Sequence, residues 1–301
     1  MKIGIDGSFP LYENLKNMDY KKENSFPPAS TLYRQITALE KKLSTLHALQ
    51  QLTERTDSQW DIDNNYRDAL LDYVEELDKL YDIAFLIIRN VSLVADEEPN
   101  DAIKWVKKYE SLKFERLNGA IKKEQEWIRL ISNLKKHDDI RVGFINMKTK
   151  TGKIIYGFFF GSIIDGYFSP ISGVHKPYIG NQTAYSYNRF VNQTVSFIFK
   201  VLNELNKILF SDCTPTNSAQ QPFISILNII KILSTTKNIF FPDEYSNNFV
   251  SYQKTKNGYT LKCIKLKYTD KYMSTSQIHM LDNQGYKGYT ITYFTLIFGQ
   301  N

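Results

Sequence analysis

Near residue 140 the spacing of apolar residues changes from that of helices to that of strands, and no other feature of the sequence limits the fold as much. Before this point apolar side chains recur every three or four residues, which lines one side of an α-helix. After it they form aromatic and β-branched runs interrupted by glycine, as strands do. The sequence therefore predicts an α+β protein, in which an N-terminal antiparallel helical bundle is followed by antiparallel strands packed on one or two buried helices.

The 301 residues are expected to form three parts. Residues 1–30 contain three prolines and show no periodicity, so we expect an irregular N-terminal arm. Residues 31–138 are expected to form the helical bundle, and residues 139–301 the α+β domain. With 42% hydrophobic residues, the chain has enough apolar material for both cores.

Three amphipathic helices are expected in the bundle. The first covers residues 32–56, the second covers residues 70–91, and the third starts at Asn100 or Asp101 and continues through Ile131. Such helices cannot bury their apolar sides alone. They must therefore pack on each other, on the second half of the chain, or on another copy.

The second half begins with a predicted hairpin. Residues 140–147 and 153–164 are its strands, and Gly152 supplies the positive φ that a short connection needs. The consecutive phenylalanines Phe158 to Phe160 cannot all face one side of a sheet, because successive side chains of a strand alternate. A long loop is expected over residues 165–182, where turn-forming residues predominate.

Two helices and further strands are expected after this loop. Residues 183–210 are apolar almost all round, which predicts a buried helix. Residues 221–234 predict a second helix, with a strand as the alternative because isoleucine is frequent there. Alternation of polar and apolar residues predicts strands at 249–254, 259–268 and 289–298.

Positive charge is concentrated in the second half of the chain. Residues 1–141 contain 22 Lys and Arg against 25 Asp and Glu, whereas the remainder contains 16 against 7. A surplus of this size attracts nucleic acid, an anionic lipid surface or an acidic protein. An ordinary lysine-rich soluble surface explains the surplus equally well.

Cysteine usage and the absence of a secretory signal predict a cytoplasmic protein. Cys213 and Cys263 lie 50 positions apart, with no Cys-x-x-Cys and no histidine nearby. The longest apolar run, residues 154–164, is interrupted by glycine and is much shorter than the roughly 20 residues of a membrane-spanning helix. We therefore expect no contact with a membrane. Four dispersed histidines predict no metal site, and the sequence contains no motif that predicts a cofactor.

One short segment, Ser132 to His137, combines groups that can bind a phosphate and move a proton. Asn133 and His137 lie one helical turn apart, and Arg129 lies one turn earlier on the same face. This segment, and loosely the helices from residue 32 onward, resembles the HEPN superfamily. These are helical-bundle proteins of toxin–antitoxin, abortive-infection and other anti-phage systems, whose active members use Arg-Asn-x-x-x-His to cleave RNA.

The resemblance implies roles for Asn133 and His137 but places Ser132 where the catalytic arginine belongs. A member that lacks this arginine is expected to be inactive, structural or regulatory, unless Arg129 replaces it from the preceding turn. Alternatively, Asn133 and His137 only end a helix, whose last carbonyl groups favour basic side chains.

The loop and the helix that follows it offer a second candidate site, for nucleic acid or a nucleotide. Its residues combine cations, aromatic rings and amides, as single-stranded nucleic-acid sites do; they are His175, Lys176, Tyr178, Asn181 and Arg189. The alternative is that the tyrosines of this loop pack on a sheet.

These patterns favour binding over catalysis. We expect a scaffold, sensor or partner subunit of a bacterial assembly, and the HEPN resemblance implies anti-phage defence. Its partner is expected to be a protein, or a second copy, bound through the N-terminal helices. The alternatives are a metal-independent ribonuclease that uses Arg129, Asn133 and His137, and a nucleic-acid-binding module in the basic C-terminal half.

Overall fold

The computed structural model describes most of the chain from residue 2 to residue 291. The described ranges are 2–5, 9–18, 26–56, 64–92, 99–137, 140–149, 152–164, 167–171, 173–175, 184–210, 223–241, 244–245, 249–256, 258–264, 273–279 and 289–291.

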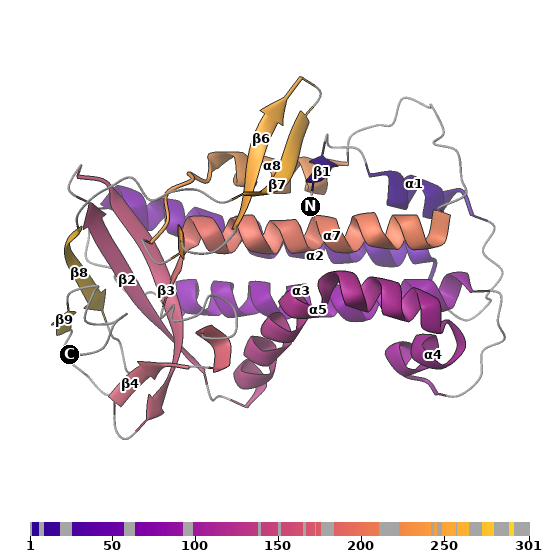
Figure 1. The fold of residues 1–301 in the computed structure, drawn as a ribbon, viewed down its shortest axis with the longest axis horizontal. Helices are drawn as coiled ribbons and strands as arrows, with labels where there is room; N and C mark the ends of the chain where they lie inside the picture. Colours follow the sequence, from indigo (N-terminus) through magenta and orange to yellow (C-terminus); the bar gives the residue numbers. More distant parts are fainter. Residues whose placement is uncertain are drawn as a thin grey trace.

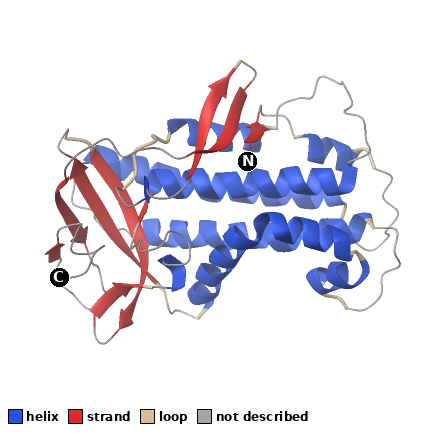
Figure 2. Ribbon diagram, in the orientation of Figure 1, coloured by secondary structure: helices blue, strands red, loops and turns tan. Residues whose placement is uncertain are grey.

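Long helices form the body of the molecule, and strands cover one end and one side of it (Figures 1 and 2). The helices α2 (Pro28–Thr56), α3 (Asn64–Val91), α5 (Ser111–Lys136) and α7 (Tyr187–Phe210) pack on one another. Side-chain contacts show that neighbours run in opposite directions: Tyr66 of α3 bonds to Gln50 of α2, whereas Glu76 bonds to Gln35. The predicted α+β class and the antiparallel helical bundle are confirmed.

The first two predicted helices match α2 and α3 closely, but the third is divided. Helix α4 (Ala102–Tyr109) ends at Glu110, whose φ of −133° and ψ of 47° are not helical, and α5 starts directly afterwards. Asp101 caps α4 as predicted, because its side chain accepts a bond of 2.9 Å from the amide of Lys104. The prediction of one continuous helix is wrong, since the break allows α4 to turn against α3 and bury Trp105.

Residues 1–30 contain more regular structure than their sequence indicates. They include the strand β1 (Lys2–Ile5) and the helix α1 (Pro10–Lys16), and α2 already begins at Pro28. Local sequence could not reveal β1, because its partner is a strand from the other end of the chain. Phe9 and the leucines of α1 are buried against the rest of the molecule.

The larger sheet lies at one end of the bundle and has the strand order β4-β3-β2-β8-β9, with β5 pairing on β3 (Figure 1). The predicted hairpin is confirmed as β2 and β3, and Gly152 between them has a φ of 80°. The strands are β2 (Arg141–Thr149), β3 (Ile154–Ile164), β4 (Tyr167–Pro170), β5 (Tyr185–Ser186), β8 (Met273–His279) and β9 (Tyr289–Ile291).

Three strands of this sheet were not expected, and one of them, β5, lies at the start of the segment that was predicted to be helical. The predicted long loop over residues 165–182 contains β4, which pairs with the second half of β3. Strand β8 pairs with β2, although its segment shows little apolar alternation. The unpaired main-chain groups at the edge of a strand that is already in place are a template on which such a segment can pair.

A second, smaller sheet lies against the side of the bundle. Its order is β1-β7-β6, where β6 is Phe249–Thr255 and β7 is Gly258–Ile264. All its pairs are antiparallel, and the β6–β7 hairpin confirms the strands predicted on either side of residue 257.

Helix α7 lies at the centre of the molecule and is buried on nearly all sides. It packs on α3, α5 and β3, and one cluster of buried apolar side chains includes residues from both halves of the chain. The three consecutive phenylalanines divide as expected, because Phe158 and Phe160 join this cluster while Phe159 joins a smaller one on the other face of the sheet. Helix α8 (Ile224–Thr235) confirms the helix predicted for its segment and excludes the strand given as the alternative. The domain boundary at residue 139 stays a prediction.

Candidate functional site

Arg129 is held by helix α3. Its Nε donates to Asp78 Oδ1 at 2.8 Å and its Nη2 donates to Asp82 Oδ1 at 2.7 Å. Gln125, one turn earlier on α5, donates to the same oxygen of Asp78 at 2.8 Å, and the guanidinium lies 5.3 Å from the ring centre of Tyr81. These contacts assign two of the five N–H donors of Arg129 to the interface between α5 and α3, where two carboxylates offset the positive charge that would attract a phosphate.

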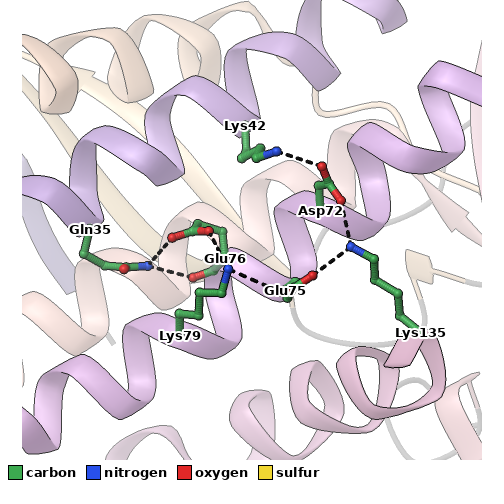
Figure 3. Close-up of polar contacts among 7 residues, drawn as sticks. All are labelled: Gln35, Lys42, Asp72, Glu75, Glu76, Lys79 and Lys135. Carbon is green, nitrogen blue, oxygen red and sulfur yellow. Dashed lines mark hydrogen bonds and ion pairs between the residues drawn. The ribbon is translucent and has the colours of Figure 1, made fainter. Parts of the chain in front are cut away.

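A network of charged side chains joins α5, α3 and α2 near the C-terminal end of α5 (Figure 3). Lys135 donates to Asp72 at 2.7 Å and to Glu75 at 2.8 Å, and Lys42 of α2 donates to the other oxygen of Asp72 at 2.7 Å. The network continues along α3 to Lys79, which lies 3.2 Å from Glu75. Three helices are thereby connected through two carboxylates.

The ionisation of these carboxylates follows from their lysine partners. Partial burial raises the pKa of Asp72, but hydrogen bonds from Lys135 and Lys42 outweigh it and leave the pKa below its usual value. The hydrogen bond from Lys135 lowers the pKa of Glu75 as well. Both carboxylates are therefore charged and paired near neutral pH, which is the behaviour of structural ion pairs and not of a general acid or base.

Gln35 closes the other end of the network in the α2–α3 interface. Its Nε2 donates to the main-chain oxygen of Glu76 at 2.9 Å and to Oε1 of the same residue at 3.0 Å (Figure 3). Both side chains are buried. Because buried polar groups need partners, this pair fixes the register of α2 on α3.

Asn133 and His137 lie one turn apart at the exposed end of α5, as the sequence predicts. The amide of His137 donates to the carbonyl oxygen of Asn133 at 3.3 Å, and both residues are exposed. Ser132, at the position of the family's arginine, is buried. The structure thus brings Asn133 and His137 together, but it leaves the guanidinium of Arg129 bonded to α3.

The second predicted site is not a surface site in its described part. His175 is buried, its Nε2 accepts from the amide of Phe160 at 3.1 Å, and its ring stacks on Tyr185. Burial lowers the pKa of His175 to about 3, so the ring is neutral at physiological pH.

Arg189 is buried as well. Its Nη1 donates to the carbonyl oxygen of Glu244, whose carboxylate accepts from the amides of Ser186 at 3.0 Å and Phe241 at 2.8 Å. His175 and Arg189 are thus buried, and both side chains bond to the protein's own groups in the core; binding of nucleic acid or a nucleotide by the predicted group of residues stays a prediction. The other three predicted residues, Lys176, Tyr178 and Asn181, lie outside the described residues.

Helix α8 packs in parallel on α2, a pairing that no local sequence pattern indicates. The hydroxyl groups of Thr37 and Ser225 lie 3.4 Å apart, Asn228 donates to Glu40 at 3.2 Å, and Thr235 lies 3.1 Å from the ring of His47. Each of these three pairs is separated by 188 positions, so the two helices run in the same direction in constant register. The polar contacts fix one side of α8, which leaves its opposite side facing solvent.

Apolar side chains gather on this outer side, where α1, α2 and α8 meet. The rings of Tyr33 and Phe223 lie 5.1 Å apart in an edge-on contact, and the guanidinium of Arg34 lies 4.5 Å from the ring centre of Phe26. The exposed fraction is 72% for Ile224 and 68% for Phe26. We name this surface the aromatic face; its residues are Tyr12, Phe26, Tyr33, Phe223, Ile224 and Leu227.

The aromatic face stands out from the rest of the described surface. Eight large hydrophobic side chains are exposed in the described residues, and four of them belong to this face. Single exposed apolar residues are ordinary, whereas a group of them marks an interaction surface. Sequence reasoning missed the group because Tyr33 and Phe223 are far apart in the chain, and the α2–α8 pairing brings their rings within 5.1 Å of each other.

Comparison with known proteins identifies no relative: no family model, no curated protein and no solved structure matches the chain. Among the described residues, no group of three or more histidines, cysteines, aspartates and glutamates is arranged to hold a metal ion. In the same residues, no helix is both long enough and apolar enough to cross a membrane.

Proposed function

We propose that this protein is a non-catalytic binding subunit that docks a partner protein on the aromatic face. The observation that carries the proposal is the aromatic face itself, where aromatic and aliphatic side chains are exposed next to an arginine. Aromatic residues and arginine are the residue types that contribute most to protein–protein binding. The proposal places the subunit in the cytoplasm and, through the HEPN resemblance, in a bacterial anti-phage system.

The charged residues near the end of α5 support a structural role for that region. Arg129 and Lys135 each bond to two carboxylates of α3. Their removal would take the cations of α5 away from four carboxylates of α3, although Asp72 and Glu75 would keep Lys42 and Lys79 as partners. On this proposal, the charged residues of the segment that resembles the HEPN motif hold helices together.

Substitution of Ile224 by glutamate should strongly reduce capture of the partner. A carboxylate in the middle of the aromatic face cannot be desolvated without a large cost. We expect affinity purification of the tagged protein from cells that naturally produce it to recover a defined partner, at a yield about tenfold lower for Ile224→Glu.

Leu112→Glu is the matched control for this experiment. Leu112 is 80% exposed at the start of α5 and does not belong to the aromatic face. Its variant should capture the partner like the wild type. Equal recovery by all three proteins, or loss with Leu112→Glu alone, would refute docking on the aromatic face.

The ribonuclease alternative rests on the exposure of Asn133 and His137 one turn apart. We expect purified protein to leave labelled RNA intact, because the nearest arginine, Arg129, is bonded to Asp78 and Asp82. Cleavage that disappears in both Asn133→Ala and His137→Ala would establish the nuclease instead. Binding of the same RNA without cleavage, weakening steeply as salt rises, would favour the alternative of a nucleic-acid-binding module.

A further inference from the structure

The rim of the aromatic face is positively charged. Arg34 and Lys41 lie two turns apart on α2, and Lys231 lies one turn beyond Leu227 on α8; all three cations are exposed. Helix α8 contains no aspartate or glutamate, and α2 contains none before Glu40. Cations therefore line an apolar surface on both helices.

The carboxylates that the structure describes near this rim do not neutralise it. Glu40 is partly buried and accepts bonds from Asn228 at 3.2 Å and from Ser44 at 2.9 Å, so its charge is directed into the α2–α8 interface. Glu13 of α1 is partly buried as well. Among the residues that the structure describes, the exposed charge around the face is thus cationic.

The apolar residues of α8 have the spacing of a helix-binding surface. Ile224 and Leu227 are three positions apart and lie on one side of the helix, and Lys231 follows four positions later on the same side. Helix α8 has 12 residues and is therefore about 18 Å long, equal to about three turns of a helix packed alongside it. Helices that bind such surfaces place residues i, i+3 or i+4, and i+7 in contact.

A second copy of the chain does not complement this surface. In a symmetric dimer the same patch contacts itself, so the exposed Arg34, Lys41 and Lys231 would face the same cations on the other copy. Juxtaposed like charges oppose association. An acidic partner, by contrast, is attracted by these three cations.

We infer that the aromatic face binds an amphipathic helix of another protein, whose apolar side is flanked by aspartate and glutamate. This inference rests on the proposed function and specifies the chemistry of the partner. The apolar side of the incoming helix covers Tyr33, Ile224 and Leu227. Its carboxylates pair with Arg34, Lys41 and Lys231 at the rim, which sets the orientation and accelerates the encounter.

Three labelled synthetic peptides of about five helical turns test the inference by fluorescence anisotropy with the full chain. The first has leucine at i, i+3, i+4 and i+7 and glutamate on the flanks, the second replaces each glutamate by lysine, and the third is a scrambled version of the first. We expect only the first to bind saturably, with an affinity that falls as salt rises. Equal binding of the scrambled or lysine peptide, or no saturable binding of the acidic peptide up to about 1 mM, overturns the inference.

Charge reversal at the rim provides the second part of the test. The double variant Arg34→Glu and Lys231→Glu should weaken binding of the acidic peptide at least about tenfold and allow the lysine peptide to bind. The matched control is Lys136→Glu, because Lys136 is exposed at the end of α5. This variant should bind the acidic peptide like the wild type. An unchanged affinity of the double variant, with circular dichroism confirming that it folds, overturns the inference.

These results separate the inference from the proposed function. If Ile224→Glu strongly reduces capture of a natural partner while the acidic peptide fails to bind, the proposed function stands and the inference falls. If light scattering shows a dimer that Ile224→Glu dissociates, the occupant is a second copy, and the inference falls as well.

Discussion

Phe190→Ala is expected to lower the free energy of unfolding by about 3–5 kcal/mol. Phe190 is fully buried in α7, and its ring meets rings from three other elements: Tyr73 of α3, Trp127 of α5 and Phe158 of β3, the last at 5.0 Å. Truncation to alanine leaves a cavity where four elements meet. Since small proteins are stable by about 5–15 kcal/mol, urea unfolding followed by circular dichroism should show a large shift of the midpoint.

Phe26→Ala is the control for this measurement. Phe26 is 68% exposed, so its truncation should change the free energy of unfolding by no more than about 0.5 kcal/mol. A cost below about 1 kcal/mol for Phe190→Ala would contradict the placement of its ring at the junction of the bundle and the sheet.

Gly157→Ala is expected to destabilise the protein by about 2–3 kcal/mol. A methyl group at this position would lie 2.3 Å from the carbonyl oxygen of Tyr185 and 2.4 Å from the ring of Phe241. The carbonyl belongs to β5, and Gly157 pairs with Ser186 of the same strand. The oxygen cannot retreat unless β5 moves away from β3, and this would displace the start of α7. Thermal unfolding should report the loss as a lower Tm.

Gly119→Ala is the matched control, because it makes the same chemical change in an open position. No atom lies within 4 Å of a methyl group built at Gly119 in α5. Alanine is favoured over glycine in a helix by about 1 kcal/mol, so this variant should raise the Tm. A higher Tm for both variants would show that β3 and β5 are not closely packed at Gly157.

Much of the fold can be predicted from local sequence patterns. Alternating steps of three and four residues located α2 and α3, and the glycine at position 152 located the first hairpin, because each signal acts within a few residues. Elements that depend on distant partners were not visible: β1 exists because β7 pairs with it, and β8 exists because β2 does. The break at Glu110 was hidden for a related reason, since apolar spacing continues across it while Trp105 packs on α3.

The dependence on distant partners limits the prediction of the candidate sites even more than that of the fold. The positions of Asn133 and His137 follow from helix geometry, and the structure agrees with them. The partners of Arg129, by contrast, lie 47 and 51 positions away, and those of Arg189 lie 55 positions away. A cation in a sequence does not reveal whether it meets solvent or a carboxylate, so the distribution of charge along the chain could not identify a binding surface.

The residues of α2 and α8 that contact each other are separated by 188 positions, and this separation affects how the protein folds during its synthesis. Thr37, Glu40 and His47 find their partners only after a further 188 residues have been added. At translation rates of about 5–20 residues per second, this takes about 10–40 s. During that time one side of the emerging helix has no native neighbour and is available to chaperones. Helix α2 emerges early from the ribosome, yet its surroundings are among the last to be completed.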